Sequence, residues 1–274
     1  MQKSLSRLCL HTITTKPWPL EKAIEKYLLS GISGISVWRN ALEGKILNEC
    51  DKLLKKSGLE VVSLVRGGFF TGATDSVRRK ALDENKRAID EAKSIDAGML
   101  VLVCGATPGQ SLEISRDQIR SALDTLIPYA EKNEIRLTIE PLHPMYADSR
   151  SAINTLQQAN EIAEYFDSPW LGVALDVYHL WWDPDLEQQI NRCSSNKNLY
   201  AVHLCDWKVP TRDMLNDREI MGKGIIELQK IIWWIERTHY DGFYEVEIFS
   251  DFYWQNDQDI FLKEIIDSFV KYQF

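Results

Sequence analysis

Short runs of apolar, largely β-branched residues recur along the chain, and a longer segment with helical periodicity follows each run. Nearly continuous apolar runs are typical of parallel strands that helices cover on the outside. The segments between the runs are long enough for the right-handed crossover helices that join parallel strands. The predicted strands are residues 8–13, 34–38, 60–65, 99–104, 135–140, 172–176, 199–204 and 243–249. The predicted helices are residues 20–29, 43–56, 76–95, 115–132, 150–165, 185–193, 224–239 and 257–272.

Eight strand–helix units in this order predict an α/β fold, a single (β/α)₈ TIM barrel that fills residues 1–274 as one domain. The alternative is an open doubly wound sheet, but no GxGxxG turn follows the first predicted strand. Capping residues agree with the division into units. The expected helix N-caps are Asp75, Ser115 and Ser149, and the glycines expected between helix and strand are Gly31, Gly58 and Gly98.

Charge and cysteine content narrow the choice of partners and compartment. The chain has 32 basic and 40 acidic residues, a formal charge of −8, whereas proteins that bind nucleic acid usually carry a basic face. Its five cysteines are scattered without CxxC spacing, which indicates reduced thiols and a cytoplasmic protein. The longest apolar run, residues 99–104, is far shorter than the roughly 20 residues of a membrane span. We therefore expect neither nucleic acid nor membrane as a partner.

The candidate chemistry lies where the predicted strands end. Active sites of α/β barrels occupy the C-terminal ends of the strands. Four consecutive strands deliver a carboxylate or an imidazole there, and further polar residues follow closely. The strand-end residues are Glu140 with His143, Asp176 with His179, His203 with Asp206, and Glu245 with Glu247.

A carboxylate inside an apolar strand is costly unless it is paired or bound to a cation. Three carboxylates and one imidazole that converge would repel one another unless a divalent ion neutralises them. Such a set of O and N donors suits Mn²⁺, Mg²⁺, Co²⁺ or Zn²⁺, and the lack of a thiolate argues against a structural zinc site. Taken singly, a strand-end Glu is more often paired with Arg or Lys, and His203 could be a hydrogen-bonded core histidine. We expect one of Glu245 and Glu247 to face the barrel and the other to face the helices.

At these residues the chain resembles the xylose isomerase-like barrel superfamily, which includes sugar isomerases, ketose 3-epimerases, inosose dehydratases and endonuclease IV-type enzymes. The matching residues are Glu140, the Asp-x-x-His of Asp176 and His179, His203, and Glu247, whose E-I-F context selects it over Glu245. The resemblance implies that Glu140, Asp176, His203 and Glu247 bind one divalent metal ion.

A second motif and two departures refine the resemblance. The segment NDREIMGKG, residues 216–224, is similar to the Asp-Arg and Gly-x-Gly that follow strand seven in the epimerases, where the Arg binds substrate oxygens; this nominates Arg218. The second Glu of the epimerases is replaced by a region with His143 and Tyr146. The ends of strands three and four offer Arg66 and Gly105 instead of the histidines of a three-metal endonuclease, which makes endonuclease activity a weaker hypothesis.

The leading hypothesis is a metal-dependent sugar or sugar-phosphate isomerase or epimerase that acts through an enediolate, with Glu140 and Glu247 transferring the proton. Rival hypotheses are a lyase or dehydratase acting on a keto-sugar or cyclic polyol, an endonuclease IV-like phosphodiesterase, and a ligand-binding barrel without activity. The expected partner is a small sugar or polyol. Aromatic residues near the C-terminus, Phe252, Tyr253 and Trp254, would fit a homo-oligomer contact or a lid. The residues expected to bind substrate are His179, Arg218, His143, Trp38 and Arg66, with Arg39 as a further candidate for a carboxylate or phosphate.

Overall fold

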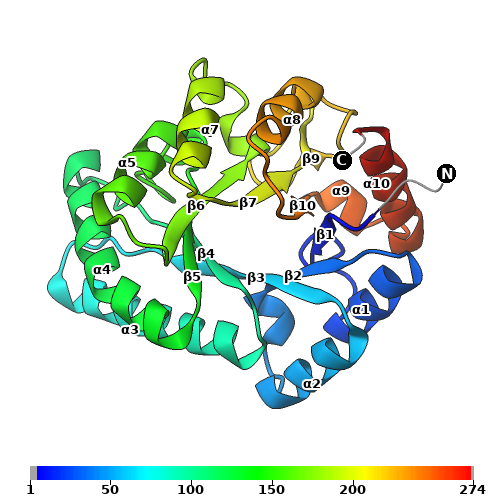
Figure 1. The fold of residues 1–274 in the computed structure, drawn as a ribbon, viewed down its shortest axis with the longest axis horizontal. Coiled ribbons are helices and arrows are strands. Elements are labelled where there is room, and N and C mark those ends of the chain that lie inside the picture. Colours follow the sequence, from blue (N-terminus) through cyan, green and yellow to red (C-terminus); the bar gives the residue numbers. More distant parts are fainter. Residues whose placement is uncertain (1–4, 273–274) are drawn as a thin grey trace.

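Parallel strands close into a barrel in the computed structural model, which describes residues 5–272 (Figure 1). Around the barrel the order is β1-β10-β7-β6-β5-β4-β3-β2, so each barrel strand pairs with the barrel strands that precede and follow it along the chain. The fold is the predicted (β/α)₈ TIM barrel. The barrel strands are β1 (Leu8–His11), β2 (Gly34–Trp38), β3 (Glu60–Gly68), β4 (Met99–Val103), β5 (Arg136–Ile139), β6 (Leu171–Asp176), β7 (Leu199–Leu204) and β10 (Tyr244–Val246).

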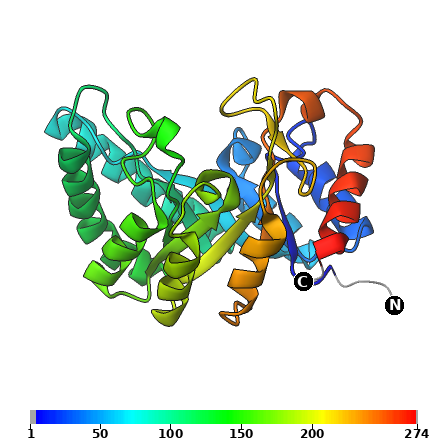
Figure 2. The ribbon, with the colours of Figure 1, turned by 90° about the horizontal axis from the view of Figure 1, so that it is seen from above.

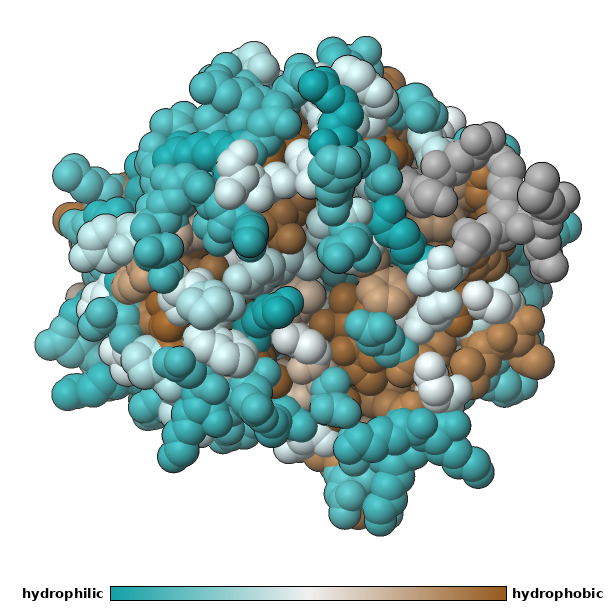
Figure 3. Space-filling view, viewed as in Figure 1, coloured by the Kyte–Doolittle hydropathy of each residue, from teal (hydrophilic) through white to brown (hydrophobic). Residues whose placement is uncertain are grey.

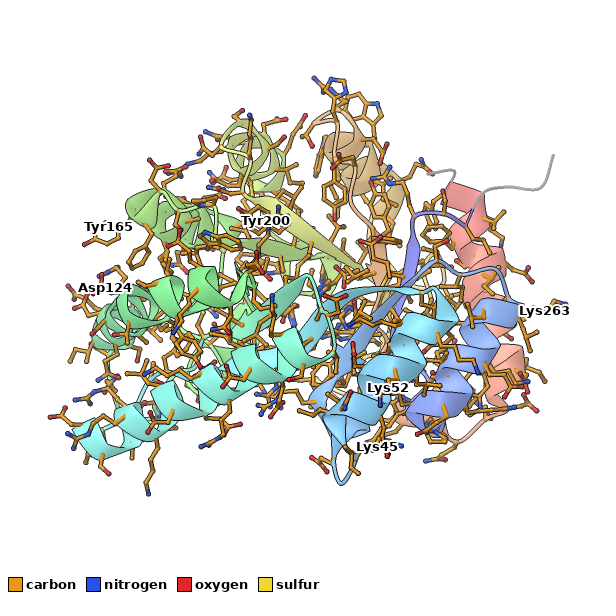
Figure 4. The ribbon with its side chains drawn as sticks, turned by 60° about the horizontal axis from the view of Figure 1, so that its bottom comes forward. Lys45, Lys52, Asp124, Tyr165, Tyr200 and Lys263 are labelled. Atoms are coloured by element: carbon orange, nitrogen blue, oxygen red, sulfur yellow. The ribbon has the colours of Figure 1, made fainter. Side chains whose placement is uncertain are left out.

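Helices surround the barrel on the outside (Figures 1 and 2). Figure 4 shows that labelled charged residues on these helices, such as Lys52, Asp124 and Lys263, point away from the barrel, and all three are exposed. The helices are α1 (Leu20–Leu29), α2 (Leu47–Ser57), α3 (Asp75–Ser94), α4 (Leu112–Asn133), α5 (Leu156–Phe166), α6 (Val177–Leu180), α7 (Leu186–Ser195), α8 (Leu228–Glu236), α9 (Asp251–Trp254) and α10 (Gln258–Tyr272). A two-stranded antiparallel ribbon, β8 (Asp206–Trp207) with β9 (Arg218–Glu219), lies outside the barrel sheet.

The strands alternate between two environments, as the pleat requires. Residues that face the helices, such as Leu10, Ile35 and Leu102, belong to the large apolar core between strands and helices. Residues that face inward form a smaller apolar cluster, which includes Cys9, Val101 and Ala174. The buried polar side chains of the strands, His203 and Glu245 among them, share this inner space, so the interior of the barrel is the polar part of the core.

The element types were predicted correctly, but several boundaries were not. The strand predicted at 243–249 forms ladder pairs only over Tyr244–Val246, and the helix predicted from 150 begins at Leu156. The predicted N-caps were wrong: Asp75 and Ser115 lie within helices α3 and α4, and Ser149 lies in a turn. The residues whose side chains cap the first turns are Thr74 of α3, Ser111 of α4 and Thr155 of α5.

The surface carries mixed polar and apolar side chains, and Figure 3 shows apolar patches between polar groups on one face. Among the three C-terminal aromatics only Phe252 is largely exposed. Tyr253 is buried and stacks on Phe261 at 4.3 Å between ring centroids, and the Trp254 indole donates a hydrogen bond to the Ile13 carbonyl. Within residues 5–272, no helix combines the length and the apolar character that crossing a membrane requires.

Candidate metal centre

Four side chains from neighbouring strands meet at one end of the barrel interior. Glu140 follows β5, Asp176 ends β6, His203 lies on β7, and Glu247 follows β10. One donor atom of each lies within 4.8 Å of the donor atoms of the others, and all four residues are buried. Asp176 and His203 are direct ladder partners, and His203 Nδ1 is 2.8 Å from Glu140 Oε1. The structure therefore brings together the four residues that the sequence nominated.

Basic side chains supply the counter-charge for this cluster. Arg218 Nη1 lies 3.0 Å from Asp176 Oδ2 and 3.1 Å from Glu247 Oε2. Burial raises the pKa of Asp176 to about 6, even with Arg218 beside it. Burial also acts to raise the pKa of Glu247, but the charges of His11 and Arg218 lower it well below its ordinary value. The pairing with basic groups that we considered for single strand-end acids is thus present here, within a cluster rather than at isolated residues.

The imidazole of His203 shows how strongly this cluster attracts a positive charge. Burial opposes protonation of the ring, yet the hydrogen bond to Glu140 and the nearby carboxylates raise the pKa of His203 to about 10. Three carboxylates around one imidazole form a donor set of O and N atoms without sulfur, which suits Mn²⁺, Mg²⁺, Co²⁺ or Zn²⁺. The residues present fit a divalent cation, because such an ion would supply in one place the positive charge that the acids otherwise take from protons and from Arg218.

A second group of polar residues lies directly beneath the four. His11 Nδ1 is 2.9 Å from Glu247 Oε1, and His11 Nε2 is 3.1 Å from Glu245 Oε2. Glu245 Oε2 also accepts hydrogen bonds from the hydroxyls of Ser36 and Ser63. His203 Nε2 and Glu245 Oε1, 3.9 Å apart, are buried and have no hydrogen-bond partner among the described residues.

This second group corrects the expectation for Glu245 and Glu247 and adds His11 to the candidate site. Glu245 and Glu247 do not face opposite sides, because residues two apart on a strand point to the same face, and both side chains contact His11 inside the barrel. Our reading of the sequence did not nominate His11. The available signal was a histidine that interrupts the apolar run of the first strand, at a position expected to be buried.

Arg218 reaches the cluster from the ribbon rather than from a barrel strand. Its guanidinium lies over the Tyr178 and Phe249 rings, 4.4 Å and 5.0 Å from their centroids, and its Nη2 is 3.3 Å from His179 Nε2. Burial and the charge of Arg218 lower the pKa of His179 well below its ordinary value, which keeps this imidazole neutral. His179 and Arg218 thus lie together beside Asp176.

Asp206 anchors the loop that carries Arg218. Its carboxylate accepts hydrogen bonds from the backbone N–H groups of Trp207, Gly222, Gly224 and Ile226, at 2.8–3.0 Å. Gly224 has no room for a side chain, since an added Cβ would lie 2.4 Å from Asp206 Oδ1. The Asp206 carboxylate therefore holds residues 206–207 and 222–224 together, and we call this set of hydrogen bonds the Asp206 clamp.

The other nominated substrate contacts border the cluster. The Trp38 indole N–H is 3.1 Å from Glu247 Oε1, so this side chain contacts a candidate ligand directly. The His143 ring is half-buried between Trp182 and Trp207, at 5.8 Å and 5.3 Å between centroids, and burial lowers its pKa. Arg66 is half-buried on the face of the Phe69 ring, 4.3 Å from its centroid.

Arg39 behaves differently from Arg66. Its guanidinium forms ion pairs with Glu84 at 2.7 Å and Glu91 at 2.6 Å, both on α3. The doubly paired Arg39 therefore ties the end of β2 to α3, and two glutamates already compensate its charge.

The geometry can be compared with known proteins. The sequence model of the xylose isomerase-like TIM barrel family matches residues 25–265, most of the chain. The chain belongs to this family. The IolI protein, solved with a bound zinc atom, superposes with a TM-score of 0.85 at 18% identity and covers 98% of this chain and 99% of that one. At this identity the likeness establishes the fold.

Two further relatives add detail. The crystal structure of protein SMc04130 from Sinorhizobium meliloti 1021 is 40% identical, with a TM-score of 0.93, and the alignment covers 97% of this chain and 98% of that one. The L-ribulose-5-phosphate 3-epimerase UlaE of Escherichia coli O1:K1 is 23% identical over 182 residues, 65% of this chain. That match spans 59% of the length of the epimerase, so the chain aligns with somewhat more than half of this relative.

Proposed function

We propose that this chain is a divalent-metal-dependent isomerase or epimerase of a sugar or sugar phosphate, which acts by proton transfer next to a carbonyl group. The observation that carries the proposal is the buried meeting of Glu140, Asp176, His203 and Glu247 at the C-terminal ends of adjacent strands. A relative named as a ribulose-phosphate 3-epimerase and a neighbour solved with zinc support it.

Glu140, Asp176, His203 and Glu247 would hold the metal. When bound, a divalent ion would polarise a substrate carbonyl and make the adjacent C–H more acidic. Glu140 and Glu247 directly follow β5 and β10, with β6 and β7 between them, so their carboxylates can approach a substrate carbon from two sides. One would take the proton and the other would return it, which gives an epimer or an isomer.

The surrounding residues would orient the substrate and the acids. The Trp38 indole and His11 each lie within hydrogen-bond distance of Glu247 Oε1 and fix the direction of its carboxylate. Arg218 and the neutral His179 offer N–H groups to substrate hydroxyls. His143 accepts the Met145 N–H at Nδ1, at 3.2 Å, which leaves Nε2–H free to donate to a substrate oxygen. The aromatic rings of Trp182 and Trp207 suit the C–H face of a sugar.

The same proton abstraction also permits a lyase, in which the enediolate expels a hydroxyl group instead of taking a proton back. The two outcomes differ in mass, because an isomerase conserves the mass of the substrate whereas a dehydratase removes one water. Mass spectrometry of the product therefore decides between them.

The test is proton exchange in D₂O. The protein, loaded in turn with Mn²⁺, Co²⁺ and Zn²⁺, is incubated with a panel of ketoses and ketose phosphates, and deuterium entry next to the carbonyl is followed by NMR. Glu247→Gln should slow exchange by about 10²–10⁴-fold, the usual contribution of a general acid or base. Glu25→Gln on α1, where the side chain is 54% exposed, is the matched control and should exchange at the wild-type rate. Exchange by Glu247→Gln at the control rate would exclude the proton-transfer role.

Chelation gives an independent check. Removal of the metal with EDTA should abolish exchange, and readdition of one of the three ions should restore it. Exchange that persists in the metal-free protein would contradict the proposal.

A further inference from the structure

The candidate metal residues occupy one half of the barrel mouth. They belong to β5, β6, β7 and β10, which are consecutive around the barrel. The other half is formed by β1, β2, β3 and β4, and β3 lies four strands away from β7 in either direction. A substrate that extends from the metal residues across the barrel mouth would therefore reach the ends of β2, β3 and β4.

Arg66 stands on this opposite half, near the C-terminal end of β3. It differs from Arg39 at the end of β2, because no ion pair or side-chain hydrogen bond joins Arg66 to any of residues 5–272. Its guanidinium lies on the Phe69 ring, which fixes its plane but leaves its N–H groups free. Burial, together with the charge of Arg150, lowers the pKa of Arg66 to about 10, and the charges of Glu140 and Glu247 act in the other direction. The charges of Arg150, Glu140 and Glu247 thus act on the Arg66 guanidinium, which packs on the Phe69 ring.

Arg150, in the loop after β5, is the second arginine near Arg66. Its guanidinium lies 5.5 Å from the centroid of Tyr146, and no carboxylate within residues 5–272 forms an ion pair with it. Tyr146 and Phe69 belong to one apolar cluster with Val103 and Leu142. A backbone contact also joins the loop that carries Arg150 to the segment that carries Phe69.

The backbone contact runs through Gly105. The Gly105 N–H donates to the Arg150 carbonyl at 2.9 Å. Gly105 also packs so closely on Phe69 that an added Cβ would lie 2.8 Å from the Phe69 Cα. Gly105 thus links the backbone of Arg150 to the Phe69 segment on which the Arg66 side chain packs, and the charges of the two arginines repel each other.

Two guanidiniums without carboxylate partners, half-buried on aromatic rings, suit a ligand that brings negative charge. We propose that Arg66 and Arg150 bind an anionic group of the substrate, a phosphate or a carboxylate, at the end away from the reacting carbons. This inference rests on the proposed function, since it places the anionic end of the same substrate that the metal residues hold. It narrows the substrate class from sugars in general to sugar phosphates and keto acids.

Direct binding tests the anion site without any turnover. Inorganic phosphate and propionate are titrated into the Mn²⁺-loaded protein, and dissociation constants are measured by calorimetry. At least one of the two anions should bind, and Arg66→Gln or Arg150→Gln should weaken it by about 10- to 100-fold, the range for one charge-assisted contact. Preference for phosphate assigns a sugar phosphate, and preference for propionate assigns a keto acid.

The control and the outcome that overturns the inference are both available in this chain. Arg79→Gln removes an exposed arginine of α3 and should leave anion binding unchanged. Arg66→Lys should retain part of the affinity, because it keeps the charge and loses the planar fork. Anion binding that is absent, or equal in wild type, Arg66→Gln and Arg150→Gln, overturns the inference.

The two proposals can fail separately. If anions bind as expected but no ketose exchanges a proton in D₂O, the isomerase proposal fails and the anion site stands. If a neutral ketose exchanges protons at equal rates in Arg66→Gln, Arg150→Gln and wild type while anions do not bind, the anion site fails and the isomerase proposal stands.

Discussion

Replacing Glu245 with glutamine would exchange one carboxylate oxygen for an NH₂ group beneath the candidate metal residues and leave all four of them in place. For His203 Nδ1 to bind a metal its lone pair must be free, so the ring proton must sit on Nε2. That nitrogen points toward Glu245 Oε1, 3.9 Å away, and neither atom has another partner among the described residues. A carboxylate that accepts the proton of the second ring nitrogen fixes the tautomer of a metal-binding histidine, and Glu245 is the carboxylate placed to do so.

The structure predicts which way the glutamine side chain will turn. Oε2 of Glu245 is the acceptor for Ser36 and Ser63 and lies 3.1 Å from His11 Nε2, so the amide oxygen should take its place. The amide NH₂ then faces His203 Nε2 and donates to it, which moves the ring proton to Nδ1. Loss of such a supporting carboxylate typically weakens metal binding by about 10–100-fold, or about 1.4–2.7 kcal/mol.

Calorimetric titration with Mn²⁺, Co²⁺ and Zn²⁺ measures this effect without knowledge of the substrate. Glu60→Gln is the control, because it removes the same charge from an exposed position at the start of β3. Thermal unfolding of the metal-free variants shows whether Glu245→Gln is folded. A folded Glu245→Gln protein that binds all three ions within about twofold of the control would refute the coupling between Glu245 and His203.

Three further predictions concern the charges and the clamp around the site. Arg218→Met leaves Asp176 and Glu247 without their guanidinium, so the metal-free protein should lose about 3–5 kcal/mol of unfolding free energy. Mn²⁺ should then raise the melting temperature more in the variant than in wild type. Equal rises would count against the pairing of Arg218 with the two carboxylates. Asp206→Asn leaves two backbone N–H groups without an acceptor and should cost about 2–6 kcal/mol in urea unfolding, whereas a loss below about 0.5 kcal/mol would contradict the clamp. Because the pKa of His203 is about 10, metal binding must release its proton, and the metal dissociation constant should fall about tenfold per pH unit from pH 7 to 9; a constant value would show that His203 is not a ligand.

Two simple rules made the barrel and three of the metal candidates accessible from the sequence, and the E-I-F motif of the resemblance selected Glu247 over Glu245 as the fourth. Apolar runs and helical periodicity mark the units, and the C-terminal ends of parallel strands meet at one end of a closed barrel. Glu140, Asp176, His203 and Glu247 lie at or near the C-terminal ends of such runs, so their convergence required no knowledge of loop structure.

The remaining features depend on contacts between distant segments. The loop between β8 and β9 folds Arg218 back into the cluster, and no periodicity in the sequence records that path. Arg150 comes beside Arg66 because the Gly105 N–H bonds to its carbonyl, which is a tertiary contact. The helix caps were misplaced for a related reason: Ser, Thr and Asp are frequent near helix starts, and only the backbone conformation selects the one that caps.

The formal charges of the barrel interior explain why binding of one divalent ion should be accompanied by release of one proton from His203. Counted by formal charge, the cluster holds four carboxylates, those of Glu140, Asp176, Glu245 and Glu247, and the pKa shifts of His203 and His11 favour their charged forms beside Arg218. Four negative charges then face three positive ones. If His203 gives up its proton and a divalent ion enters, Arg218, His11 and the ion supply four positive charges, and the interior becomes neutral. Neutrality is the arrangement that a buried site favours most strongly, because an uncompensated charge there has no water to stabilise it. This balance requires that Arg218 keep its charge in the metal-bound protein, where it remains available to a substrate oxygen.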